Sequence, residues 1–269
     1  MRALSTRNAL IGHTGFVGST LLRQTSFDGH FRSTNIGEID ASTFDSVVCA
    51  AAPAQKWIAN RDPGRDADNI ETLIGHLRQV DCRVFVLVST VDVFKEPLAV
   101  DEHSVVDEDG LHPYGRHRRW LERFVESHFE THLIVRLPGL VGPGLRKNII
   151  FDLLNRNNLD AVDSRGVFQF YPMVNLWQDI QIALRAGLRC VHLTAEPISV
   201  AEVAHSGFGE RFENALGTDP ARYDMRSRHA ALFGGHGHYP YSRRESLLAI
   251  RAYAQSEPRG LPCVSGGGV

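Results

Sequence analysis

Residues 9–18 have the sequence ALIGHTGFVG, and this stretch decides the fold. It joins a short apolar run at residues 8–11 to a segment with helical patterning at residues 16–24. In a strand–turn–helix with this glycine spacing, Gly12 permits the tight turn, Gly15 lets a pyrophosphate approach the backbone, and Gly18 lets the helix lie close to the strand. The helix start adds free N–H groups and a partial positive charge. A dinucleotide-binding turn is therefore expected, with contacts from Gly12, Thr14, Gly15, Phe16, Val17 and Gly18.

Short apolar runs alternate with helical patterns through residues 1–142. Strands are expected at 44–52, 84–89 and 132–136, helices at 66–80 and 114–129, and a polar strand is compatible with 28–35. Continuous apolar strands that alternate with helices indicate a parallel sheet covered on both faces. The predicted fold is therefore α/β, a doubly wound parallel Rossmann sheet.

Beyond residue 143 the alternation loosens. The patterns there predict a strand at 190–193 and helices at 149–154, 176–187, 199–203 and 242–253. We expect residues 143–257 to form a small C-terminal substrate-binding lobe, interleaved with the end of the sheet. The glycine-rich tail at 258–269 is expected to be disordered.

Composition narrows the function classes. The chain has 269 residues and a formal net charge of −2, which favours neither nucleic acid nor an anionic membrane as a partner. No apolar stretch approaches the roughly 20 residues that span a bilayer. No signal peptide is visible, so the cytoplasm is the expected compartment. The four cysteines Cys49, Cys82, Cys190 and Cys263 are far apart and form no CxxC pair, so no metal site is expected.

The choice between NAD and NADP depends on the end of the second strand. An acidic residue there binds the ribose hydroxyls of NAD, and a basic residue suits the phosphate of NADP. Residues 31–35 read FRSTN and contain no acid. Arg32 and Ser33 suit a phosphate, although an arginine at a strand edge is more often merely solvated. The sequence leaves both cofactors open, with a slight preference for NADP.

Hydroxyl side chains and a cation lie at and after the end of the strand at residues 84–89. Ser89 and Thr90 follow the strand VFVLV, Tyr114 opens a helix, and Arg118 lies one turn later on the same face. Here the chain resembles the extended short-chain dehydrogenase/reductases, which include NAD-dependent sugar-nucleotide epimerases, dehydratases and reductases. The resemblance is carried by the segments GHTGFVG, VCAAA, VLVSTVDVF, YGRHR and RLPGLVGPG, and more weakly by FYPMVNLWQDI and EPISVAEVA.

This resemblance implies roles for individual residues. Thr90, or Ser89 in its place, would hydrogen-bond the substrate oxygen, and Tyr114 would be the general acid/base. The family lysine that binds the nicotinamide ribose is replaced by Arg118, which can hold the ribose and bias Tyr114 toward the phenolate but does not readily release a proton. The further residues expected to line the cofactor are Ala50, Ala51, Ala52, Ser89, Pro138 and Gly139.

Three functions stay open at this point. The first is an NAD(P)-dependent oxidoreductase, epimerase or reductase acting on a nucleotide sugar or a similar carbonyl compound. The second is a non-catalytic dinucleotide-binding or redox-sensing protein, and the third is a scaffold without cofactor. Thr90 alone suits a strand-end cap, and Tyr114 alone suits packing at a helix start. The resemblance also implies a homodimer through the helices at 66–80 and 114–129.

Overall fold

The computed structural model describes residues 7–260 and shows two compact units. The first comprises the chain as far as Lys95, Val106–Arg136 and Ile180–Val191, and the second comprises Glu96–Val105, Leu137–Asp179 and the chain from His192 onward. Cys263 and residues 261–269 of the predicted tail lie outside the described residues.

A six-stranded sheet forms the centre of the first unit within residues 7–260, in the order β10-β6-β4-β3-β1-β2. Its strands are β1 (Asn8–Ile11), β2 (Gly29–Phe31), β3 (Thr43–Cys49), β4 (Asp81–Thr90), β6 (His132–Leu137) and β10 (Cys190–His192). The pairs β1–β2, β1–β3 and β3–β4 are parallel. Because β2 and β3 lie on opposite sides of β1, the strand order reverses there, where doubly wound proteins form their ligand crevice. The predicted fold class is confirmed.

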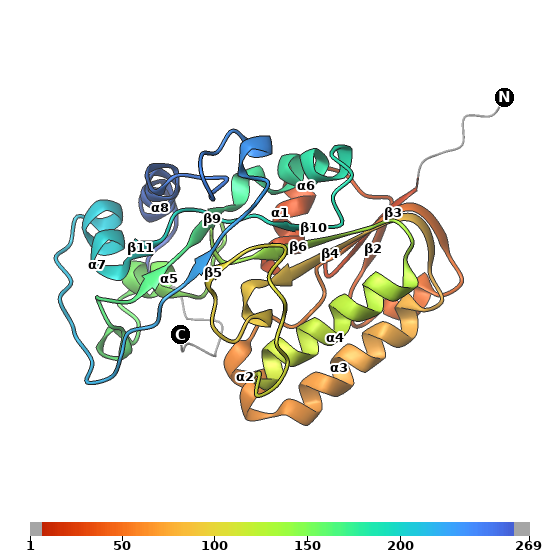
Figure 1. The fold of residues 1–269 in the computed structure, drawn as a ribbon, viewed down its shortest axis with the longest axis horizontal. Coiled ribbons are helices and arrows are strands. Elements are labelled where there is room, and N and C mark those ends of the chain that lie inside the picture. The colour runs from red at the N-terminus through yellow and green to blue at the C-terminus, as the bar shows by residue number, and fades with distance from the viewer. Residues whose placement is uncertain (1–6, 261–269) are drawn as a thin grey trace. The chain divides into compact units, whose positions relative to one another are not determined.

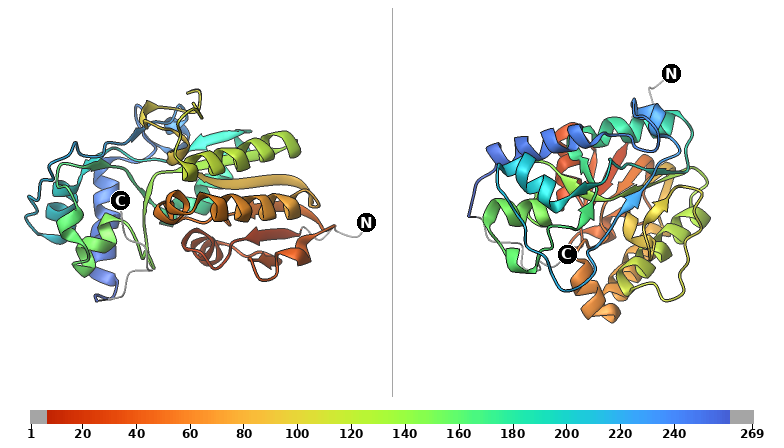
Figure 2. Two further views of the ribbon diagram at one scale, coloured as in Figure 1. Left: turned by 90° about the horizontal axis from the view of Figure 1, so that it is seen from below. Right: turned by 60° about the vertical axis from the view of Figure 1, so that its left-hand side comes forward.

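Helices α1 (Phe16–Gln24), α2 (Lys56–Arg61), α3 (Pro63–Leu77) and α4 (Pro113–His128) belong to the same unit. Proline at the first position of α3 and α4 fixes the backbone for a helix start without losing a hydrogen bond. The side chains of Asp62 and His112 then accept backbone N–H bonds from the first turn of each helix. Helices α3 and α4 lie side by side in both figures (Figures 1 and 2).

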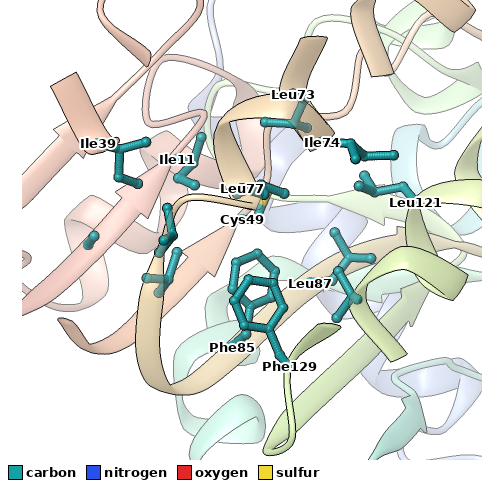
Figure 3. Close-up of a cluster of buried hydrophobic side chains, with 14 of the residues drawn as sticks. Ile11, Ile39, Cys49, Leu73, Ile74, Leu77, Phe85, Leu87, Leu121 and Phe129 are labelled. Carbon is teal, nitrogen blue, oxygen red and sulfur yellow. The ribbon is translucent and has the colours of Figure 1, made fainter. Parts of the chain in front are cut away.

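The core of this unit lies between the sheet and helices α3 and α4. Ile70, Ile74 and Leu77 project from one face of α3 onto β3 and β4, and all three are buried. The rings of Phe85 and Phe129 stack against each other (Figure 3), and their centroids lie 4.1 Å apart. Burial of such side chains is the main source of stability, and it fixes the ends of the strands, where the candidate site lies.

Several elements differ from the sequence expectation, including three in the first unit near the glycine loop and α2. The polar strand expected at 28–35 is short, because the Asn35 side chain accepts the Arg32 N–H at 2.8 Å and turns the chain after Phe31. The strand expected at 44–52 ends at Cys49. Helix α2 was not expected, since six residues carry too little periodicity to be recognised.

The second unit contains short paired strands. Within the described residues these are β7 (Gly139–Val141) with β9 (Phe170–Pro172), β8 (Val167–Phe168) with β11 (Ile198–Ser199), and β5 (Leu98–Val100) with β12 (Asp224–Met225). Its helices are α5 (Ile149–Asn155), α7 (Val200–Val203) and α8 (Arg243–Ser256), and α6 (Leu176–Arg185) passes from this unit into the first. Helix α8 begins with a capping box between Ser242 and Glu245.

None of the helices in residues 7–260 is both long and apolar enough to cross a membrane. The same residues contain no cluster of three or more His, Cys, Asp or Glu side chains arranged to hold a metal ion.

Candidate active site

The glycine loop connects β1 to α1, and each of its three positions requires or permits glycine for a different physical reason. Gly12 has φ +85°, and a Cβ on it would lie 2.5 Å from the Ala50 carbonyl oxygen. A Cβ on Gly18 would lie 2.1 Å from the Gly12 oxygen, so this glycine is required for close packing of helix and strand. A Cβ on Gly15 would meet its nearest neighbour only at 3.5 Å. Packing within the described residues therefore does not require glycine at position 15. A position with this free space suits contact with a ligand.

The carboxyl ends of β1, β2 and β3 meet around this loop. The Gly12 N–H donates to the Phe31 oxygen at 2.8 Å, and the Ala50 N–H donates to the Ile11 oxygen at 2.8 Å. Residues Ala50 to Ala52 follow β3 and are partly buried, whereas Arg32 and Ser33 follow β2 and are exposed. The predicted glycine loop, Ala50 to Ala52, and the pair Arg32 and Ser33 therefore all lie at the carboxyl ends of these three neighbouring strands.

The start of α1 is suited to an anion. Thr14 and Gly15 are exposed, and Phe16 and Val17 are partly buried in the first turn. Within residues 7–260 no side chain caps this helix. Uncapped N–H groups at a helix N-terminus bind phosphate through hydrogen bonds and the helix dipole. The residues present therefore fit the pyrophosphate of a dinucleotide.

Ser89 and Thr90 end β4, and their hydroxyls have different partners. Ser89 donates to Glu122 of α4 at 2.6 Å, below the site. The Thr90 oxygen accepts the Asp92 N–H at 3.1 Å, so Thr90 caps the turn that follows the strand. Thr90 also contacts the Asp92 carboxylate at 3.3 Å. Thr90 therefore caps the end of the strand, as one of the two interpretations expected. The Ser89 hydroxyl is used in its hydrogen bond to α4.

Tyr114 and Arg118 lie one turn apart at the start of α4. The Arg118 guanidinium carbon is 4.4 Å from the centroid of the Tyr114 ring, which places a cation over the aromatic face. Burial raises the pKa of the Tyr114 phenol, and Arg118 lowers it only in part, so the net pKa lies above its ordinary value. The expected bias toward the phenolate is thus present as a contribution but does not prevail.

Arg118 is 2% exposed and is bound by protein groups. Its Nη1 and Nη2 atoms donate to the two oxygens of Asp66 at 3.0 and 3.1 Å, and Nη2 also donates to the Pro53 carbonyl. Its Nε atom is buried and lacks a hydrogen-bond partner within the described residues. The predicted ribose contact of Arg118 stays a prediction, and on this geometry it falls to Nε or the remaining Nη1 proton.

Glu122 fixes α4 to the sheet beneath Tyr114. Its carboxylate is fully buried and accepts hydrogen bonds from Arg136 at 2.9 and 2.7 Å, from Arg119 at 3.0 Å and from Ser89. Burial raises the pKa of Glu122, but these hydrogen bonds, with Arg136 foremost, outweigh burial and bring it below its ordinary value. The charged Glu122 carboxylate therefore joins the middle of α4 to β4 through Ser89 and to β6 through Arg136.

Sequence reasoning missed several residues of this site, namely Lys56, Asn60, Asp66, Asp92, His112 and Glu122. Asp66 had a detectable signal, because it lies on the apolar face of α3 with Ile70 and Leu73, where an acid requires a cation. Lys56 and Asn60 had none, because α2 was not expected.

Pro138 and Gly139 belong to the second unit. Pro138 separates β6 from β7, and Gly139 begins β7. A Cβ on Gly139 would lie 2.7 Å from the Gln169 oxygen, so packing within that unit accounts for this glycine. Their predicted contact with the cofactor stays a prediction.

No family model and no curated protein matches the chain. Solved structures do match. The dTDP-4-dehydrorhamnose reductase of Yersinia enterocolitica is 15% identical, with 93% of this chain and 99% of that chain covered and a TM-score of 0.73. The corresponding reductase of Bacillus anthracis, in complex with NADP, is 15% identical over 96% and 100% of the two chains, with a TM-score of 0.70. A UDP-glucuronic acid 4-epimerase mutant of Bacillus cereus, with a UDP-sugar analogue and NAD, is 14% identical over 93% and 99%, with a TM-score of 0.68.

At these identities the likeness establishes the fold. The chain shares the fold of these reductases and epimerases, a parallel Rossmann-type sheet of the kind that the sequence motifs predicted. It spans nearly the whole length of the solved chains it matches.

Proposed function

We propose that this protein is an NAD(P)-dependent enzyme of the short-chain dehydrogenase/reductase type, an oxidoreductase, epimerase or reductase acting on a nucleotide sugar or a similar carbonyl compound. The observation that carries the proposal is the position of Gly12–Gly18 and of Thr90 at the carboxyl ends of strands in one parallel sheet. Tyr114 lies at the start of α4, which packs against the turn that follows Thr90. The solved structures of similar fold include reductases and epimerases with NADP, NAD or a UDP-sugar analogue bound.

The cofactor would be held by groups from three strand ends. Backbone amides at the start of α1 would bind the pyrophosphate, and Ala50 to Ala52 would line the cofactor beyond β3. Arg32 and Ser33 would bind the extra phosphate of NADP, which is the basis for a slight preference over NAD. When bound, the nicotinamide supplies or accepts a hydride at the substrate carbon.

Tyr114 and Thr90 would act on the substrate oxygen. Because burial keeps the pKa of Tyr114 above its ordinary value, the phenol is protonated at neutral pH and can donate its proton. In the direction of reduction, the Tyr114 proton moves to the carbonyl oxygen, while the Thr90 hydroxyl orients that oxygen. The structure therefore favours Tyr114 as a general acid in its resting form.

The test combines a binding titration with a turnover assay. NADPH and NADH are titrated by fluorescence, and nicotinamide absorbance at 340 nm is followed with a panel of dTDP- and UDP-4-keto sugars. We expect Tyr114→Phe to abolish turnover while the cofactor Kd stays within a factor of about two, because the phenol oxygen acts in proton transfer. Unchanged turnover in this variant would refute the catalytic assignment, and no binding of either dinucleotide by the parent would refute the function as a whole.

A second candidate is a dinucleotide-binding protein without catalysis. The observation that favours it concerns Arg118, the residue in the place of the family lysine. Arg118 makes two hydrogen bonds to Asp66. Binding of NADPH or NADH without turnover across the sugar panel would support this candidate. A gain of turnover in Arg118→Lys would point the same way.

We also propose a homodimer through α3 and α4. What supports it is the adjacency of the two helices, whose outward positions include the exposed Gly64, Thr72 and Gly75, small residues that permit close approach of a second copy. Light scattering coupled to size exclusion measures the mass directly. A monomer at micromolar concentration would remove the proposal.

A further inference from the structure

Lys56 and Asn60 lie one turn apart on α2 and both face residues of the candidate site. The Asn60 side-chain oxygen accepts the Tyr114 N–H at 3.0 Å. The Lys56 ammonium donates to the Asp92 carboxylate at 2.8 Å. Residues at this spacing share a helix face, so one side of α2 contacts the segments that carry both predicted catalytic hydroxyls.

Asp92 connects Lys56 to Thr90 and to the start of α4. One carboxylate oxygen of Asp92 contacts Lys56, and the other lies 3.3 Å from the Thr90 hydroxyl. The Asp92 carbonyl lies against α4, where a Cβ on Gly115 would be only 2.1 Å from it. This contact holds Asp92, and with it Lys56, next to the turn that begins with Tyr114.

Lys56 differs from Arg118 in freedom of movement. Arg118 is 2% exposed and makes a double contact with Asp66. The Lys56 side chain is 34% exposed and its ammonium is carried on a flexible four-carbon stem. The chain has three lysines, Lys56, Lys95 and Lys147, and the hydrogen bond of Lys56 to Asp92 joins it to the Thr90 turn.

We propose that Lys56, oriented by Asp92, is the positioning cation of this site, and that it stabilises the negative charge which Tyr114 acquires on giving up its proton. In the reduction considered above, the O–H bond of Tyr114 breaks and its proton forms a new O–H bond on the substrate oxygen. A reduced nicotinamide, when bound, would supply the hydride to the carbonyl carbon, so the step would leave one new negative charge on the protein, the tyrosinate. The inference thus rests on the proposed function, and it transfers to Lys56 a role that the sequence pattern offered to Arg118.

The charged and titratable groups around Lys56 provide reporters. Asp92 comes from the turn after β4, His112 from the residue before α4, and Tyr114 and Arg118 from α4 itself. Burial lowers the pKa of His112, and Lys56 lowers it further, while Asp92 acts in the opposite direction. Lys56 also lowers the pKa of Tyr114. We therefore expect both pKa values to rise when the Lys56 charge is removed.

The experiment is an NMR titration of the full-length protein without cofactor. The ring resonances of His112, assigned from their loss in His112→Asn, are followed from pH 4.5 to 8.5 in the parent and in Lys56→Met. We expect the pKa of His112 to rise by up to about one unit in Lys56→Met and to return toward the parent value in Lys56→Arg, because arginine restores the charge. Lys95→Met is the matched control, since Lys95 is exposed in the same unit and its loss changes the net charge equally.

Turnover supplies the second readout. Where the sugar panel gives turnover, we expect Lys56→Met to lower kcat at least 10-fold with little change in KM for NADPH, and Lys56→Arg to restore most of it. A His112 pKa that is the same in Lys56→Met as in the parent would overturn the inference, and so would an unchanged kcat. NADPH binding by the parent tests the proposed function separately, because the NMR titration needs neither cofactor nor substrate.

Discussion

Both carboxylate oxygens of Asp66 accept hydrogen bonds from Arg118, at 3.0 and 3.1 Å, and the two side chains are almost completely buried. His117 adds a third contact to Asp66 at 2.7 Å. This pair joins α3 to α4 directly behind Tyr114. Arg118 therefore also has a structural role, because it joins these two helices.

Replacement of Asp66 by Asn should be strongly destabilising. The variant leaves the buried Arg118 charge without its anion, which costs about 3–5 kcal/mol in comparable buried pairs. Urea unfolding followed by circular dichroism measures the change in the free energy of unfolding. Asp68→Asn, at an exposed position of the same helix, is the control and should change it by less than about 0.5 kcal/mol. Equal stability of the two variants would contradict the structural role of the pair.

The glycines of the loop should separate folding from cofactor binding. Gly15→Asp has room in the protein and should keep a melting temperature near that of the parent, but it places a side chain and a negative charge where the pyrophosphate would bind. Gly18→Ala should lose at least about 2 kcal/mol of stability, because its Cβ overlaps the Gly12 carbonyl. Thermal melting and NADPH titration are measured on both. Normal NADPH binding by a folded Gly15→Asp protein would place the cofactor elsewhere.

Much of the first unit could be predicted from sequence because its signals are local. The strand at residues 8–11, the helix at 16–24 and the helix beginning at Pro113 follow from apolar runs, glycine spacing and a proline start. The partners of individual side chains could not be predicted. Arg118 was expected to face the ribose, but whether it finds Asp66 depends on the packing of α3 against α4, which no local pattern specifies. Lys56 lay in a segment too short to indicate a helix.

The second unit shows the same limit from another side. The helices expected at 149–154 and 242–253 from their apolar spacing are present as α5 and α8. The two- and three-residue strands of this unit were not, because they are fixed by long-range contacts such as the Gln169 side chain, which bonds both Ala195 and Met225. Position in the fold, rather than propensity, decides such segments.

Glu122 and Glu126, one turn apart on α4, form a natural pair for comparison. Glu122→Gln should cost about 3–5 kcal/mol, because buried Arg136 loses its anion. Glu126→Gln removes an exposed ion pair with Arg119 and should cost less than about 1 kcal/mol. Urea unfolding at pH 7 measures both. A small loss in Glu122→Gln would mean that the network does not anchor α4 to the sheet.

Asp179 should give the protein a distinctive pH dependence. Its carboxylate is buried in the second unit and accepts hydrogen bonds from Tyr171 at 2.6 Å and Tyr241 at 2.7 Å. Burial raises the pKa of Asp179 to about 6, and the two tyrosines offset this only in part. In the unfolded chain the pKa of Asp is about 3.9, so the folded protein binds more protons than the unfolded one between these two values.

The sign of the effect follows from this proton uptake. The contribution of Asp179 to stability is fully present below about pH 4 and is lost as the pH rises through about 6, amounting to roughly 3 kcal/mol over that window. Asp179→Asn cannot titrate, so the difference in unfolding free energy between parent and variant isolates this group from the other carboxylates. We expect that difference to shift in favour of the parent when urea unfolding is carried out at pH 4.5 instead of 7.5. A difference that does not change with pH would show that Asp179 keeps an ordinary pKa in the folded protein and that its two tyrosine partners compensate its burial completely.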